Sequence, residues 1–224
     1  EPQPGQMTST PPPGPGPCGS RTYNSGISAL ISRVSEWLTA SIPEDPTFNQ
    51  LPLSFEMNVG QSEARYQFLA MGAGHYVYLS PDSLVLDLRD DGDASSGVVE
   101  MKLPGANPKA VWESLEALPG RVNYIKGNDE ARWLTNIPTY ARVRYRNVYP
   151  GIDVDYYGRQ EELEYDFVVQ PGADPRAIRM QFTGDVTLSL ETDGALAVRH
   201  GERIVRWHRP RVHQRVAGQQ RQIE

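Results

Sequence analysis

The chain has 224 residues, of which 22 are basic and 28 acidic, for a formal net charge of −6 at pH 7. Its 38% of hydrophobic residues are enough for a buried core, which excludes a wholly disordered chain. The acidic balance argues against nucleic acid as a partner, because proteins that bind it carry basic surfaces that displace counterions from phosphates. No apolar run is long enough for a transmembrane helix.

Residues 1–24 form a Pro/Gly-rich arm, in which four of the five residues Pro11–Pro15 are proline. Proline lacks an amide donor and favours extended polyproline conformation, so this arm is predicted to be a stiff tether. Such a spacer is typical of mature exported proteins, and we expect an extracellular or cell-surface location after removal of a signal peptide. Cys18 is the only cysteine, so it cannot form an internal disulfide. It is interpreted as a thiol on the arm that is available for contacts with a partner.

Residues 25–46 are predicted to be an amphipathic helix and a linker. Within Gly26–Ala40 the apolar residues recur at steps of three and four, which is helical spacing. Asn24 or Ser25 can cap the start, and Pro43 follows the end. The helix either packs on its own domain or docks a protein partner through its apolar residues. These residues are Ile27, Leu30, Ile31, Val34, Trp37 and Leu38.

Residues 47–224 are predicted to be β-rich, because short runs with period-two alternation are separated by Gly, Pro, Asp and Ser. The predicted strands are Tyr66–Met71, His75–Leu79, Leu84–Leu88, Val98–Leu103, Tyr140–Tyr145, Ile152–Tyr157, Glu162–Val169, Ala177–Phe182, Val186–Leu190, Ala195–His200 and Arg203–Trp207. Such strands predict an antiparallel β-sandwich or two packed sheets, with sub-sheets at about 47–117 and 118–224. Pro175 is expected to open a single helical turn.

Three arginines, Arg142, Arg144 and Arg146, lie two residues apart and therefore share one face of their predicted strand. The next strand carries Asp153 and Asp155 on one face, so cross-strand ion pairs are the expected arrangement. That face of the second strand is predicted to be in contact with solvent. The alternative is a surface that binds a carboxylate or a sugar, such as a surface glycan, through Arg142, Arg144, Tyr145 and Tyr157.

Acidic residues suggest two further kinds of site. Asp90, Asp91 and Asp93 resemble part of a calcium loop, but the complete ligand pattern is missing, so calcium is only a weak alternative to the prediction of no cofactor. Glu162, Glu164 and Asp166 share a strand face and could serve a glycoside-type hydrolase if they lay in a cleft with a raised pKa. No nucleophile elbow or phosphate-binding loop is present, and we predict that the chain is not an enzyme.

Three blocks, 51–79, 118–158 and 163–184, together carry a family resemblance. Their most specific pieces are Asn123-Tyr124, Gly127-Asn128-Asp129, Trp133, Tyr149-Pro150-Gly151-Ile152-Asp153, Tyr156-Tyr157, Glu164-Tyr165-Asp166 and Pro171-Gly172-Ala173-Asp174-Pro175. Over residues 51–222 the chain resembles the uncharacterised N-terminal domain that precedes SBBP-type β-propeller repeats in large secreted bacterial proteins. The resemblance implies a surface location and no assigned activity.

Together these features predict a non-catalytic extracellular or cell-surface structural module. The protein partner is either a further domain of the same polypeptide or copies of this chain, because an open sheet edge is a template for strand addition. A carbohydrate-binding or adhesion module is the alternative, and a hydrolase is the second alternative.

Overall fold

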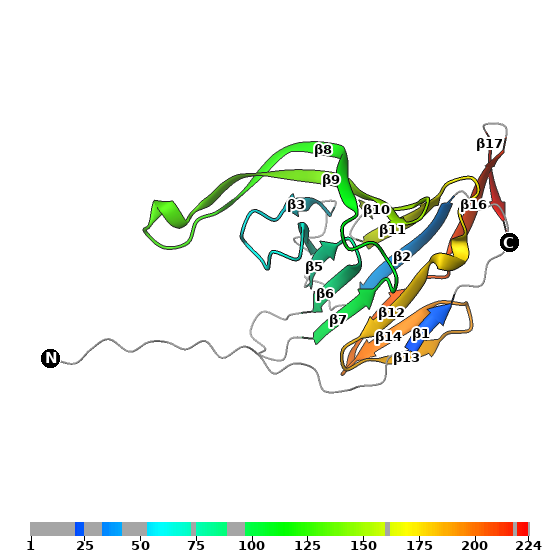
Figure 1. Ribbon diagram of the computed structural model, residues 1–224. Helices are drawn as coiled ribbons and strands as arrows, with labels where there is room; N and C mark the ends of the chain where they lie inside the picture. Colours follow the sequence, from blue (N-terminus) through cyan, green and yellow to red (C-terminus); the bar gives the residue numbers. More distant parts are fainter. Residues whose placement is uncertain are drawn as a thin grey trace.

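A computed structural model describes residues 21–24, 33–41, 53–72, 75–88, 97–159, 162–216 and 219–223 (Figure 1). The strands that precede the long ribbon are β1 (Arg21–Asn24), β2 (Arg33–Ser41), β3 (Phe55–Met57), β4 (Phe68–Gly72), β5 (His75–Ser80), β6 (Ser83–Leu88) and β7 (Gly97–Lys102). The ribbon consists of β8 (Val111–Tyr124) and β9 (Leu134–Tyr149), with a 3-10 turn, η1 (Glu130–Arg132), between them.

The second half continues with nine elements. They are β10 (Ile152–Arg159), β11 (Glu162–Val169), the 3-10 turn η2 (Pro175–Ala177), β12 (Arg179–Thr183), β13 (Thr187–Leu190), β14 (Leu196–His200), β15 (Arg203–Trp207), β16 (Arg211–Val216) and β17 (Gln219–Ile223). The predicted mainly β class is therefore confirmed, and η2 is the turn that Pro175 predicted.

The described strands form one continuous sheet, and every pairing in it is antiparallel. One end is β13, and the order runs through β14, β15, β2, β11, β10, β9, β3, β4, β5, β6, β7 and β12 to β1. β16 also pairs with β2, beside β15. The pairings of β3 with β9 and of β12 with β7 join strands on both sides of residue 117.

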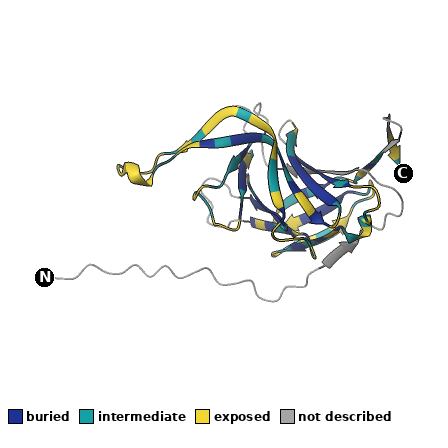
Figure 2. Ribbon diagram, turned by 45° about the horizontal axis from the view of Figure 1, so that its top comes forward, coloured by how far each residue is buried: buried dark blue, intermediate teal, exposed yellow. Residues whose placement is uncertain are grey.

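The sheet curls around an apolar core, which is why its strands are buried on their inner face (Figure 2). Tyr145, Tyr156 and Tyr165 lie in this core, and their rings follow one another at centroid distances of 6.1 and 5.9 Å. The Tyr165 hydroxyl points at two methionine sulfurs, Sδ of Met101 at 3.6 Å and Sδ of Met180 at 3.3 Å. The core therefore links β10 and β11 to β7 and β12 across the curl.

The predicted N-terminal helix is wrong where the structure describes it. Residues 33–41 form β2, which pairs with β11 along one edge and with β15 and β16 along the other. Main-chain hydrogen bonds to three strands outweigh the helical spacing of the apolar residues, because helix propensity is a weak determinant when tertiary pairing is available. The first part of the predicted helix, residues 25–32, lies outside the described residues.

The β8–β9 ribbon extends beyond the body of the sheet (Figure 1). Its tip is exposed, as Figure 2 shows, and carries η1, which Asp129 caps by accepting a hydrogen bond from the Ala131 amide. The indole Nε1 of Trp133 donates to the Gly127 carbonyl oxygen at 3.2 Å. These bonds keep the tip ordered without burying it.

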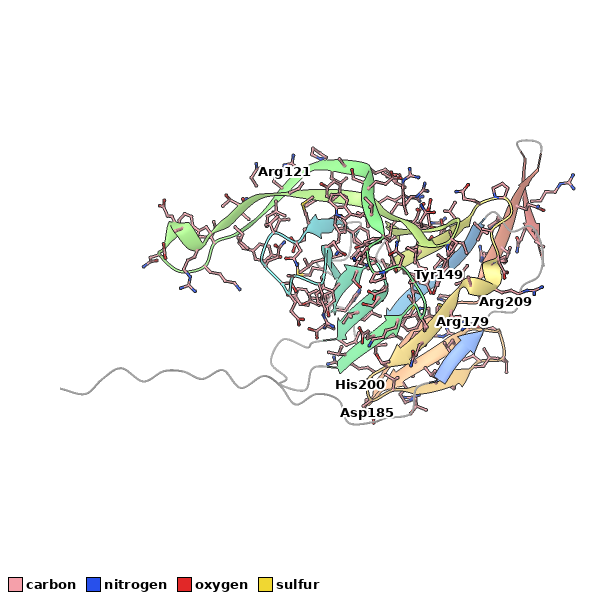
Figure 3. All side chains as sticks on the ribbon, in the orientation of Figure 1. Arg121, Tyr149, Arg179, Asp185, His200 and Arg209 are labelled. Carbon is pink, nitrogen blue, oxygen red and sulfur yellow. The ribbon has the colours of Figure 1, made fainter. Side chains whose placement is uncertain are left out.

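Two turns contain a glycine with a positive φ angle, as their sequences predict. Gly151 in the turn from β9 to β10 has φ +70°, and Gly172 has φ +87°. Figure 3 shows Tyr149, which precedes the first turn, next to Arg179 of β12. The Tyr149 hydroxyl lies 3.3 Å from the Arg179 carbonyl oxygen and 3.3 Å from that of Pro104.

Among the described residues, none of the helical segments is long and apolar enough to cross a membrane.

Candidate functional site

The outer face of β9, β10 and β11 carries a charged cluster in which Arg144 and Asp155 are the central pair. Their positions are directly opposite in the register of β9 and β10. The guanidinium donates from Nε to Oδ1 at 2.5 Å and from Nη2 to Oδ2 at 2.8 Å, a bidentate arrangement. The hydrogen bond with Asp155 raises the pKa of Arg144, against the opposing effect of burial. The predicted cross-strand ion pair is therefore present.

The other two arginines of β9 have different partners. Arg142 approaches Asp155 at 3.6 Å and lies over the Tyr157 ring, with its Cζ 4.0 Å from the ring centroid. Arg146 donates instead to Glu113 of β8 at 2.7 Å. One ring face of Tyr157 is thus covered by a guanidinium, and that face is not open for stacking on a sugar.

The prediction of a solvent-facing side for Asp153 and Asp155 is wrong. Both residues are buried, at 4% and 0% exposure. The Asp153 carboxylate accepts a hydrogen bond from the Asn147 amide at 2.8 Å, beside an irregularity in the β9–β10 register. A buried carboxylate is stable only when donors or cations compensate it, and here the main chain and Arg144 do so.

Two further carboxylates from β11 complete the cluster. Asp166 lies directly opposite Asp155, and Glu164 lies directly opposite Tyr157. Asp166 is fully buried and accepts a hydrogen bond from the Tyr157 hydroxyl at 3.2 Å, whereas Glu164 is 3% exposed and lies 3.8 Å from Arg159. With Asp153 and Asp155, the outer face therefore holds four buried carboxylates from two neighbouring strands.

Glu164 is buried, and its surroundings shift the pKa of its carboxyl group. Burial raises its pKa, and the hydrogen bond from Tyr157 and the charge of Arg159 oppose that rise only in part. A raised pKa on a buried carboxylate is one of the two conditions that a hydrolase requires. Asp155, however, is paired with Arg144, and Asp166 accepts a hydrogen bond from Tyr157, so both carboxylates have partners within the sheet.

The remaining predicted site residues do not join this cluster. Tyr145 points to the opposite face of β9, where it is fully buried and donates to Gln67 at 3.2 Å. Cys18, Ile27, Leu30, Ile31, Asp90, Asp91 and Asp93 lie outside the described residues. Within the described ranges, no group of His, Cys, Asp or Glu side chains is arranged to hold a metal ion.

The predicted partner residues Val34, Trp37 and Leu38 belong to β2, whose position is a second feature of functional interest. They lie opposite Phe167, Glu164 and Leu163 of β11. Neither β1 nor β3, the neighbours of β2 along the chain, pairs with it in the described structure. β2 therefore fills a gap between strands that come from much later in the sequence.

Sequence reasoning missed a group of tyrosines that lies around the outer face of β5. Tyr66 and Tyr78 have ring centroids 5.1 Å apart, and Arg65 lies over Tyr66 at 4.6 Å. Tyr124 of β8 donates to Glu56 of β3, beneath the ribbon. The alternation in His75–Leu79 already separates tyrosines from apolar residues, and this signal could have placed Tyr76 and Tyr78 on the outer face.

The comparisons with known proteins place this fold in one family. Residues 55–224 match a family described as a domain of unknown function, DUF7948. No curated protein and no solved structure gives a significant match. The match spans β3 to β17 and leaves β1 and β2 outside it. Because it covers most of the chain, this protein belongs to the DUF7948 family.

Proposed function

We propose that this chain is a non-catalytic structural module of the cell surface or extracellular space, which assembles through its N-terminal segment. The observation that carries the proposal is the position of β2. This strand lies outside the family match, yet it occupies a central place in the sheet with partners on both edges.

The pairing of β2 supports exchange between copies. All its partners come from residues 163–213, so no short hairpin holds it to its own chain. Residues 42–54 connect it to β3, a connection long enough for β2 to reach either its own sheet or that of a neighbour. Exchange of an identical element between copies creates an interface that repeats every native contact.

Resemblance to domains of large secreted proteins supports the location, and the main-chain character of the contacts supports a structural role. In this proposal the gap beside β11 accepts β2 from the same chain or from a second copy. The charged cluster of Arg144, Asp155 and Asp166 then serves as a rigid support for the strands that border the gap.

The test is the native mass of the full chain, measured by light scattering over a wide range of concentrations. We expect oligomers whose fraction rises with concentration. A chain that begins at Arg21 is the proper comparison, because it keeps both β1 and β2, and we expect it to assemble equally. A monomer at every concentration would contradict the proposal.

A disulfide trap identifies the contact in any oligomer. Trp37→Cys and Glu164→Cys, with Cys18→Ser, place two thiols at directly opposite positions, where Cα atoms lie about 4.5–5.5 Å apart. Oxidised oligomers should contain peptides 37 and 164 joined between chains. If the oligomers persist while every disulfide stays within one chain, assembly does not use β2. The pair Val111→Cys and Arg146→Cys, also directly opposite, serves as the control within one chain.

A further inference from the structure

The outer face of β4 to β7 exposes three large, mainly apolar side chains in one row. The registers align Met71, Tyr76, Asp87 and Val98 across four neighbouring strands. Met71 is 69% exposed, Tyr76 39% and Val98 41%. Met71 and Tyr76 are adjacent in this row, whereas the buried Asp87 separates Tyr76 from Val98, so the row exposes three large side chains on both sides of a buried carboxylate.

Tyrosines border this row and form what we call the tyrosine surface: Tyr66, Tyr76, Tyr78 and Tyr124. Tyr78 is one row away from Tyr76 on β5 and contacts Tyr66. Tyr124 reaches the surface from the ribbon and donates to Glu56. Burial and this hydrogen bond raise the pKa of Tyr124, and the neighbouring Tyr76 and Tyr78 add to the rise.

This chemistry suits a polyproline-type segment. Proline rings pack on aromatic faces, and the segment's carbonyl oxygens have no internal partner, so they accept hydrogen bonds from tyrosine hydroxyls. The chain itself contains such a segment, Pro11–Pro17, with the sequence PPPGPGP. Residues 2–20 carry no charged side chain, so the nearby carboxylates Glu56 and Glu100 do not repel them.

The position of β1 brings that segment within reach. β1 begins at Arg21, and the registers through Phe182, Met101 and Leu84 put Arg21 in line with Leu79, next to Tyr78. β1 is four strand steps from β5, which is about 19 Å at about 4.8 Å a step. Pro17 and Pro11 precede Arg21 by four and ten residues, and at about 3.1 Å per residue they reach about 12 and 31 Å.

We propose that Pro11–Pro17 docks on the tyrosine surface of its own chain, across the outer face of β4 to β7. The docked segment covers Met71, Tyr76 and Val98. It thereby holds the N-terminal arm against the sheet and gives the exposed row its partner.

Cys18 allows a direct test in the full chain. A fluorophore on this thiol lies one residue after the segment, and its anisotropy reports whether the segment is held. We expect a high value in the natural sequence. Replacing the five prolines of Pro11–Pro17 by serine should lower the anisotropy almost to the value of a free labelled peptide. Tyr76→Ser should lower it to a similar extent. Val111→Ser, at an apolar position of β8 that is 71% exposed, should leave it unchanged.

Thermal melting tests whether each variant is folded, and the serine substitutions in residues 11–17 lie outside the described strands. If Tyr76→Ser leaves the anisotropy unchanged, the docking site is wrong. In a separate measurement on the full chain, a photo-crosslinker at position 76 identifies the segment that lies on this surface. Linkage to residues 11–17 of the same chain supports the proposal. Linkage between two chains, or to no part of the arm, overturns it, and neither result bears on exchange of β2.

Discussion

At the residue scale, the charged cluster shows how a strand can be buried on both faces. Inner residues of β10 such as Tyr156 are apolar or aromatic and enter the core, whereas the outer residue Asp155 is buried because Arg144 and Arg142 compensate it. The sequence predicted the pairing from spacing alone. It could not predict the burial, because the side chains that cover Asp155 come from other strands.

Arg144→Ala should destabilise the protein by about 3 kcal/mol, because it removes the bidentate partner of a fully buried carboxylate. Arg146→Ala, two residues along β9, is the matched control. Its side chain is 51% exposed and pairs with the partly exposed Glu113, so we expect a loss of about 0–1 kcal/mol. Urea denaturation measures both.

The apolar double variant Arg144→Met with Asp155→Leu should recover much of the lost stability, since it leaves no charge unpaired. Equal losses for Arg144→Ala and Arg146→Ala would show that Asp155 is compensated by other means, such as Arg142.

Glu164 makes stability depend on pH with a definite sign. Because its pKa is raised in the folded protein, the folded state binds more protons than the unfolded state, so this residue lowers stability as pH rises through and above the ordinary value of 4.5. Glu164→Gln should therefore raise the melting temperature at pH 7. The difference should vanish below that ordinary pKa, where both states are protonated.

Glu162→Gln, on the same face of β11 but less buried, is the control and should change the melting temperature less at pH 7. A Glu164→Gln variant that melts lower than the natural protein at neutral pH would mean that the attraction to Arg159 outweighs the cost of burial.

At the element scale, strands were predicted correctly where apolar and polar residues alternate regularly. Strands were missed where only their pairing with distant strands determines the structure. The strands from β4 to β7 and from β10 to β15 lie within a few residues of their predicted bounds. β8 was missed because Pro119-Gly120 interrupts it and most of its side chains are exposed. Proline is tolerated there because β8, in the described structure, pairs only with β9 and is an edge strand.

β2 was missed for a different reason. The steps of three and four among its apolar residues fit a helix, and nothing local in the sequence reveals the partners at residues 163–167 and 204–213. The candidate site shares this limit. Arg142, Arg144 and Asp155 were predictable from one hairpin, whereas the tyrosine surface unites β3, β4, β5 and β8 through long-range pairing.

At the scale of the whole molecule, the curl brings distant parts of the sheet together. Figure 3 shows His200 beside Asp185, and the His200 Nδ1 lies 2.9 Å from the Asp185 carbonyl oxygen. The His200 ring also lies against Gly97 at the start of β7. Gly184, between β12 and β13, approaches β7 at the same place, so this corner connects the two ends of the sheet.

Gly184→Ala should therefore weaken the closure of the curl. At φ +112° a side chain is strained, which costs about 1–3 kcal/mol, and a Cβ would lie 2.7 Å from the Val98 carbonyl oxygen. Gly172→Ala is the control, because it has φ +87° with nothing within 4 Å of the added carbon and so incurs strain alone.

Chemical denaturation should show a larger loss for Gly184→Ala than for Gly172→Ala. Amide hydrogen exchange should locate the extra loss in β7 and β12, because displacement of the Val98 carbonyl disturbs the pairing of Glu100–Lys102 with Gln181–Thr183. If the two variants lose equal stability and β7 keeps its protection, the corner at Gly184 adapts to a side chain. The curl would then be held by its core, through Tyr165, Met101 and Met180, instead of by its edge.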